Sequence, residues 1–391
     1  MKKLLFLLVS CATFLVNAQV EQEKADASNH IQTTSGYLFT TIVDLETTSV
    51  KDQAKSSTCW SFSGVSFLES EIIRVHHQQI DLSEMFVVRM AYIDKARKYV
   101  RMHGKIAFAP GGEVPDVLYV LDKYGAMPEA AYTGLENADD RHNHNKLQKS
   151  LKTYLDELIA QLEIKPDWES DFNNILDQHL GTLPDSFSYA GKVFTAESFA
   201  RDIVKLNTRD YISITSFTHH PFYSSFALEI PDNWMWSSSY NLPLDEMIDV
   251  LEQSLLNGYT VAWAADNSEK GFSSRNGLAL LPAKDWAQMS LAERELVFSG
   301  PHTEMMVTQE WRQLNFDNYN TQDDHGLHFV GIVKDQENNY YFIAKNSWGE
   351  KSNNYRSGYL YASKAYVRGK TISLLVHKAA LSKKLKKKLG V

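Results

Sequence analysis

The order of hydrophobic patterns along this chain constrains its fold more than any other feature. Between residues 62 and 75 apolar side chains recur every three or four positions, which is typical of one face of an amphipathic helix. Short apolar runs that are typical of strands come later, for example at 329–333 and 340–345. Helices that precede strands in this way indicate an α+β fold with two lobes.

Residues that start and stop helices mark the first lobe. A helix that begins at Cys59 has Ser57 or Thr58 as its candidate N-cap residue. Ser83 precedes a second helical pattern, and residues 116–124 form a third pattern that ends before a glycine.

Changes in composition divide the chain into segments. A stretch rich in charge and in leucines at helical spacing follows the first lobe and predicts a helical insertion. The six predicted segments are a signal peptide at 1–18, a flexible leader at 19–40, a helical lobe at 41–136, the helical insertion at 137–209, a β-rich lobe at 210–376 and a Lys-rich tail at 377–391.

The N-terminus has the pattern of a secretory signal peptide. Two lysines precede an apolar run from Leu4 to Val16, and a small residue, Ala18, marks a plausible cleavage point. We therefore expect export to the periplasm or the medium. Lipid attachment at Cys11 is a weaker alternative, because the apolar run continues past that residue. No later stretch approaches the length of a membrane span, so none is predicted.

Charge argues against nucleic acid as the main partner. The formal net charge is −8, and the six lysines of the tail leave the rest of the chain still more acidic. Binding to phosphate needs a basic surface, which only this tail could offer.

Cys59 stands out because the chain has only 2 cysteines, too few for a disulfide scaffold, and the other lies in the signal segment. At the start of a helix, free amides and a partial positive charge favour a thiolate. Cys59 is therefore a candidate nucleophile. Its own N–H and the side-chain amide of Gln53 are candidate donors to an oxyanion.

A predicted hairpin supplies the candidate base. Two strands flank a turn at 334–339, and a symmetric hairpin places His325 across from Asn346. An amide can fix the orientation of an imidazole, and Trp348 could shield that hydrogen bond from water. His328 is three residues further on and is expected on the opposite face of the strand.

These motifs together resemble papain-like cysteine peptidases. The segments that carry the resemblance are Gln53–Phe62 around the cysteine, Asp324–Gly331 around the histidine and Asn346–Gly349 around the asparagine. The resemblance implies catalysis by Cys59, His325 and Asn346, with Gln53 at the oxyanion. It also implies a substrate-binding strip at Gly111 and Gly112, a contribution from Trp348 to substrate binding, peptide substrates, and no cofactor or metal.

Within that family the chain is most similar to the bleomycin hydrolase and aminopeptidase C branch, over roughly residues 40 to 380. The features are the long insertion and the absence of disulfide cysteines. This branch implies a hexameric homo-oligomer, and an aminopeptidase whose C-terminal arm blocks one side of the cleft. Here we expect this arm to be shortened or missing, because a short Lys-rich tail occupies 377–391, so an open-cleft endopeptidase is the alternative.

Other classes of function have weaker support. A metal site could use Asp323, Asp324, His325 and His328, whose side chains suit zinc or a harder cation. A binding protein that has lost catalysis would keep the fold without turnover. A serine hydrolase is disfavoured because no G-x-S-x-G motif occurs.

Overall fold

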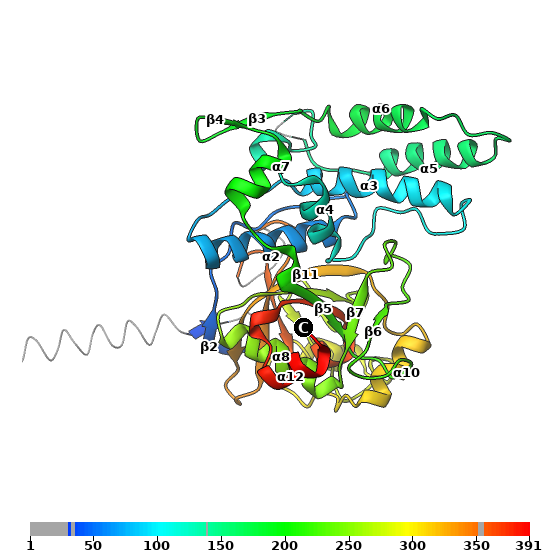
Figure 1. The fold of residues 1–391 in the computed structure, drawn as a ribbon. Helices are drawn as coiled ribbons and strands as arrows, with labels where there is room; N and C mark the ends of the chain where they lie inside the picture. The colour runs from blue at the N-terminus through cyan, green and yellow to red at the C-terminus, as the bar shows by residue number, and fades with distance from the viewer. Residues whose placement is uncertain (1–29, 33–35, 138–139, 351–355) are drawn as a thin grey trace, which may run out of the picture.

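The computed structural model describes residues 30–32, 36–137, 140–350 and 356–391. It confirms the predicted α+β fold with two lobes, a helical one above and a β-rich one below in Figure 1. The predicted signal peptide at 1–18 and Cys11 lie outside the described residues. None of the described helices is long and apolar enough to cross a membrane.

The helical lobe is built around α2 and α3, and α3 begins after Ser83, whose hydroxyl accepts a hydrogen bond from the Phe86 N–H. The third predicted helix is confirmed at Asp116–Tyr124. The helices of this lobe are α2 (Cys59–His76), α3 (Glu84–Arg101), α4 (Asp116–Tyr124), α5 (Asn145–Ile159), α6 (Trp168–Leu180) and α7 (Ala196–Phe199), with short turns η1 (Glu129–Ala131), η2 (Ala200–Val204) and η3 (Thr208–Asp210). The segment predicted as a helical insertion also contains a hairpin of β3 (Phe187–Tyr189) and β4 (Lys192–Phe194).

One mixed sheet forms the β-rich lobe, in the order β6-β7-β5-β14-β8-β11-β12-β13-β10-β9, with β2 also paired to β11 and to β1. Its strands are β1 (His30–Gln32), β2 (Leu38–Asp44), β5 (Tyr211–Thr215), β6 (Ser225–Ala227), β7 (Ser238–Asn241), β8 (Val261–Ala265), β9 (Phe272–Ser273), β10 (Leu278–Ala279), β11 (His325–Lys334), β12 (Tyr340–Lys345), β13 (Tyr359–Ser363) and β14 (Thr371–His377). Strand β2 thus begins before the lobe boundary drawn at 41.

Helices flank this sheet. They are α8 (Leu244–Leu256), α9 (Leu291–Leu296), α10 (Gln309–Asp317), α11 (Lys364–Lys370) and α12 (Lys383–Leu389), with short turns η4 (Trp286–Gln288) and η5 (Lys378–Ala380). Apolar side chains from α8, α12 and the sheet form one buried core.

The two lobes meet where α2 packs on β11 (Figure 1). Gly326 makes this approach close, since a Cβ at this position would lie 2.5 Å from Ser63 Oγ and 3.1 Å from the Cys59 carbonyl oxygen. Only a glycine fits such a contact without displacing backbone. The start of α2 is therefore held beside the start of β11, which brings Cys59 next to His325.

The β11–β12 hairpin has a different register from the predicted one. Lys334 pairs with Tyr340 and His328 with Lys345, with a bulge between Phe329 and Gly331. The loop is centred later than a symmetric hairpin about His325 and Asn346 requires. His325 lies instead beside Ala265 of β8, and Asn346 follows the end of β12.

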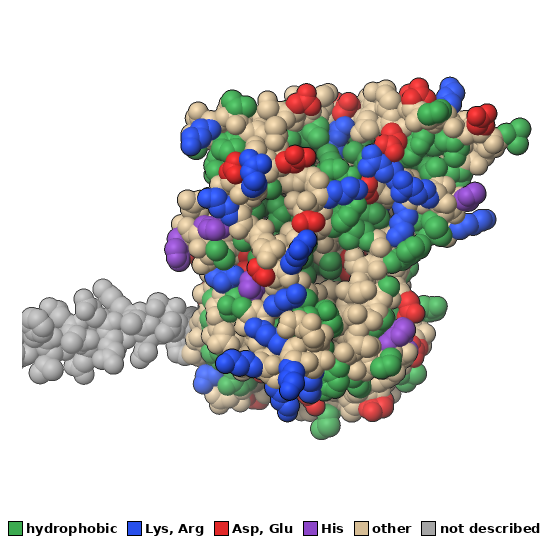
Figure 2. Space-filling view, viewed as in Figure 1, with side chains coloured by type: hydrophobic (Ala, Val, Ile, Leu, Met, Phe, Trp, Pro, Cys, Tyr) green, Lys and Arg blue, Asp and Glu red, His purple; other side chains and the backbone are tan. Residues whose placement is uncertain are grey.

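The Lys-rich tail docks on α8 at the base of the β-rich lobe. Lys388 Nζ lies 2.9 Å from Glu246 Oε1, and Leu385 and Leu389 are buried in the core beneath. Figure 2 shows Lys and Arg side chains gathered on this face over α12.

Substitution of the α3 cap tests how the helical lobe is anchored. The Ser83 hydroxyl accepts from Phe86 N–H and donates to the Tyr132 carbonyl, so Ser83→Ala removes two buried hydrogen bonds. We expect the free energy of unfolding in urea to fall by about 1–2 kcal/mol. Ser382→Ala, which removes the cap of the short peripheral helix α12, should cost less. If the two substitutions lower the free energy of unfolding equally, the Ser83 hydrogen bonds do not anchor the helical lobe.

Candidate active site

A cleft of about 330 Å³ lies between the lobes and collects residues from distant parts of the chain. The residues predicted from the sequence that line it are Gln53, Cys59, Gly111, Gly112, His325 and Trp348. Asn346 does not line the cleft but lies directly behind His325. The structure therefore brings all seven predicted site residues together.

Cys59 is the first residue of α2 and is partly exposed to the cleft. Neither predicted cap residue closes this end of the helix through its side chain, because the Thr58 hydroxyl instead hydrogen bonds with Ser56 Oγ at 2.7 Å. The first amides of α2 thus stay available to the nucleophile and to a substrate oxygen.

Burial dominates the ionisation of Cys59. It raises the pKa of the thiol to about 12, although backbone hydrogen bonds from Gly326 and Trp60 act in the opposite direction. The charges of Asp323 and Asp232 raise this pKa further. The lowered pKa predicted from the helix terminus alone is therefore wrong for the resting site. Cys59 needs a partner that accepts its proton.

The hydrogen bonds of Asn346 determine which nitrogen of His325 can be that partner. The Ser347 N–H donates to Asn346 Oδ1 at 2.8 Å, which identifies this atom as the amide oxygen. His325 Nε2 lies 2.8 Å from the same oxygen and must therefore be the protonated nitrogen. Nδ1 of the neutral imidazole is left as the acceptor for the proton of Cys59.

Aromatic rings enclose the histidine. The Trp348 ring lies 4.8 Å from the His325 ring at an interplanar angle of 30°, and Phe272 contacts both rings. Burial lowers the pKa of His325 to about 4, against a smaller raising effect of the Asn346 hydrogen bond. A lone charge is thus disfavoured on either group. Proton transfer from Cys59 to His325 creates both charges at once, so each becomes the counter-ion of the other.

Gln53 is fixed by the segment that carries the asparagine. Its backbone N–H donates to the Ser347 carbonyl at 2.8 Å, and its Oε1 accepts from Ser347 Oγ at 2.6 Å. Because Oε1 is occupied in this way, the Nε2 amide is the group that remains to donate into the cleft. This arrangement suits a developing oxyanion, together with the Cys59 N–H.

The predicted substrate-binding strip forms one wall of the cleft. A Cβ on Gly111 would lie 1.9 Å from Asp232 Oδ2, and one on Gly112 would lie 2.9 Å from the Trp60 ring. The buried ammonium of Lys95 donates to the Gly111 carbonyl and to that of Ala109. The strip is therefore rigid, and its backbone rather than side chains faces a substrate.

Several residues around this cleft have no recognisable signal in the sequence. Asp232 and Phe272 come from segments without a local motif, and Lys95 lies in the middle of a regular helix. Glu113 directly follows the predicted glycine strip, and this proximity was the one available signal.

The alternative metal site does not assemble from the four side chains proposed for it. Asp324 accepts hydrogen bonds from the backbone N–H groups of Asn267 and Ser268. His328 is buried, and its Nδ1 lies 3.0 Å from Ser66 Oγ. Within the described ranges, the converging group of three or more metal-ligand side chains is a different one, and it lies outside the cleft.

Comparisons with known proteins agree on one family. A family model described as "Peptidase C1-like family" matches residues 10–390. Aminopeptidase C of Lactobacillus helveticus is 22% identical over 426 residues, covering 96% of this chain and 90% of that protein. Aminopeptidase C of Lactococcus lactis subsp. cremoris is 20% identical over 380 residues, covering 87% and 83%. The crystal structure of PepW from Lactobacillus rhamnosis superposes with a TM-score of 0.69 at 19% identity, covering 90% of this chain and 84% of that one, and shows the same fold.

The reactivity of Cys59 tests the proposed partnership with His325. In His325→Ala the thiol keeps the pKa raised by burial but loses its proton acceptor, so less thiolate forms at neutral pH. We expect iodoacetamide to alkylate Cys59 at least about tenfold more slowly than in the unsubstituted protein, with the rate recovering only in strong alkali. Mass spectrometry of the labelled peptide gives the rate.

His220→Ala is the matched control, because this histidine lies outside the cleft. It should alkylate like the unsubstituted protein. An unchanged pH profile in His325→Ala would contradict the assignment of His325 as the base.

Proposed function

The chain belongs to the Peptidase C1-like family, and from this premise we propose that it is a cysteine peptidase, an aminopeptidase of the bleomycin hydrolase type. Cys59 is the nucleophile, His325 the base and acid, and Asn346 orients the imidazole. The observation that carries the proposal is the pair of hydrogen bonds to Asn346 Oδ1, because they leave His325 Nδ1 unprotonated in a cleft that it shares with a thiol.

The geometry supports a two-stage hydrolysis. His325 Nδ1 takes the proton of Cys59 as the sulfur attacks the peptide carbonyl carbon, and Gln53 Nε2 and the Cys59 N–H stabilise the oxyanion. When the tetrahedral intermediate collapses, the C–N bond breaks and His325 returns the proton to the leaving amine. Nδ1 then deprotonates a water that attacks the thioester, which releases the acid and restores the thiol.

The names of the relatives, Aminopeptidase C, support action at the N-terminus of a peptide. One observation favours the alternative, an endopeptidase with an open cleft. The Lys-rich tail at 377–391 docks on α8, and none of its residues is among those that line the cleft. In this structure the tail therefore does not restrict the cleft to N-terminal residues.

Export and self-association remain proposals. The basic start and apolar run of residues 1–18 support export, and N-terminal sequencing of secreted or periplasmic material tests it, with Gln19 as the expected first residue. An N-terminus at Met1, or retention in the cytoplasm, would contradict export. The homo-oligomer, a hexamer in the related branch, rests on the family resemblance.

Turnover of a fluorogenic aminoacyl amide tests the proposed chemistry. Cys59→Ala should abolish hydrolysis while the protein stays folded, because no other group replaces the sulfur. Gln53→Ala should lower kcat by about 10²–10³, the usual effect of losing one oxyanion donor. Ser347→Ala should have a smaller effect in the same direction, because it removes only the hydroxyl that orients the Gln53 amide.

Ser382→Ala serves as the control, since it removes a serine hydroxyl far from the cleft. Undiminished hydrolysis by Cys59→Ala would refute the proposed function.

A further inference from the structure

Four carboxyl groups gather on one side of the cleft, where the mechanism above does not use them. Asp232 and Asp323 line the cleft, while Glu113 and Asp116 lie directly behind its wall. Burial raises the pKa of the Glu113 and Asp323 carboxyls, and protonated Glu113 donates a hydrogen bond to Asp323. We call these four residues the carboxyl cluster. The ammonium of Lys95 faces it but is already held by the carbonyls of the strip.

The carboxyl cluster has acceptor atoms that the protein does not satisfy. Glu113 is 5% exposed, yet its Oε1 has no hydrogen-bond partner among the described residues, and the same holds for Oδ1 of the fully buried Asp116. The Asp232 carboxylate accepts no hydrogen bond from the described parts of the chain, apart from its electrostatic attraction to Lys95. Buried acceptors of this kind are normally paired, so the cluster is built to receive a donor.

The position of the cluster points to a donor carried by the substrate. Asp232 abuts Gly111 of the strip, and both Asp232 and Asp323 are near enough to Cys59 for their charge to oppose its ionisation. Negative charge beside a nucleophile that must become a thiolate is a disadvantage unless a cation neutralises it. A peptide with a free N-terminus brings such a cation, its α-ammonium group, to within one residue of the scissile bond.

We propose that the carboxyl cluster, through Asp232 and Asp323, binds the α-ammonium group of the substrate and thereby confines cleavage to the first peptide bond. This inference rests on the proposed function and names the residues of the cleft that confine cleavage to the N-terminus. The bound ammonium also cancels the charge that opposes ionisation of Cys59. An acylated N-terminus therefore loses both binding and activation of the nucleophile.

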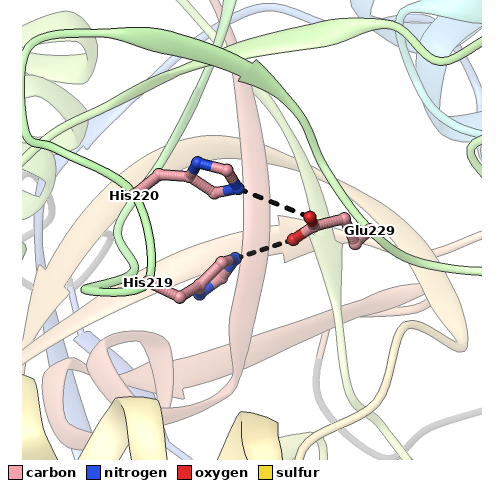
Figure 3. A group of neighbouring side chains, drawn as sticks. All are labelled: His219, His220 and Glu229. Carbon is pink, nitrogen blue, oxygen red and sulfur yellow. Dashed lines mark hydrogen bonds and ion pairs between the residues drawn. The ribbon is translucent and has the colours of Figure 1, made fainter.

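A second group of side chains outside the cleft, His219, His220 and Glu229, converges in the manner of a metal site (Figure 3). Its converging atoms already contact one another without an ion. The Thr218 N–H donates to Gln313 Oε1, so Gln313 Nε2 is the group that donates to His219 Nδ1. His219 Nε2 therefore carries the proton, and it lies 3.0 Å from Glu229 Oε2. We therefore use Glu229 as a control position.

Three coumarin amides distinguish the sources of the ammonium group. They are a leucyl amide, its N-acetylated form, and an N-acetyl-lysyl-leucyl amide whose cation is on a side chain. The unsubstituted enzyme should cleave the leucyl amide and leave both acetylated substrates essentially intact. Asp232→Asn should lower kcat/KM for the leucyl amide by about 30-fold or more. Glu229→Gln, a matched removal of charge on the same segment of chain, should have no effect.

Alkylation of Cys59 separates loss of binding from damage to the site. Asp232→Asn removes a charge that raises the pKa of the thiol, so iodoacetamide should label Cys59 faster at neutral pH even as hydrolysis falls. If Asp232→Asn lowers the rate of Cys59 alkylation together with the rate of hydrolysis, the proposal is overturned, since that result indicates a distorted site.

Two other outcomes would also overturn the proposal while leaving the cysteine peptidase in place. One is equal cleavage of the acetylated and free leucyl amides. The other is Asp232-dependent cleavage of the acetyl-lysyl substrate, which assigns the cluster to a side-chain ammonium. If no substrate is hydrolysed by the unsubstituted enzyme, the proposed function itself fails and the ammonium site fails with it.

Discussion

The carbonyl oxygen of the Asn346 side chain accepts two hydrogen bonds, and the arrangement of the active site depends on them. The bond from the Ser347 N–H fixes the amide, and the amide then fixes the tautomer of His325. Ser347 also orients Gln53 through its hydroxyl and its carbonyl. A two-residue segment after β12 thus positions both the base and an oxyanion donor. The close contact at Gly326 holds α2 and its cysteine against them.

Burial disfavours a single charge on Cys59 or His325 but allows the two to be charged together. It raises the pKa of Cys59 and lowers that of His325, so neither group ionises readily alone. Transfer of one proton between them produces an ion pair whose members stabilise each other in a poorly solvated cleft. The carboxyl cluster adds a further condition, because its charge opposes the thiolate until a cation arrives. In this view, substrate recognition and activation of the nucleophile are the same electrostatic event.

Local signals were enough to predict the elements that carry the site. The hydroxyl of Ser83 marked the start of α3, the glycine after Tyr124 marked the end of α4, and the motifs around Cys59, His325 and Asn346 identified the reacting groups. What escaped prediction depends on contacts between distant segments. The turn of the β11–β12 hairpin is centred later than predicted, burial reversed the expected shift of the Cys59 pKa, and nothing near Asp232 in the sequence indicates that it reaches Gly111.

The tautomer of His325 is the point on which the account can be tested most directly. Nitrogen-15 NMR of the protein labelled at histidine reports the protonation of each ring nitrogen, and the signals of His325 are assigned by their loss in His325→Gln. We predict, at neutral pH, a proton on Nε2 and an unprotonated Nδ1. A proton on Nδ1 with Nε2 unprotonated would contradict the account, because the nitrogen assigned as the base could then accept no proton.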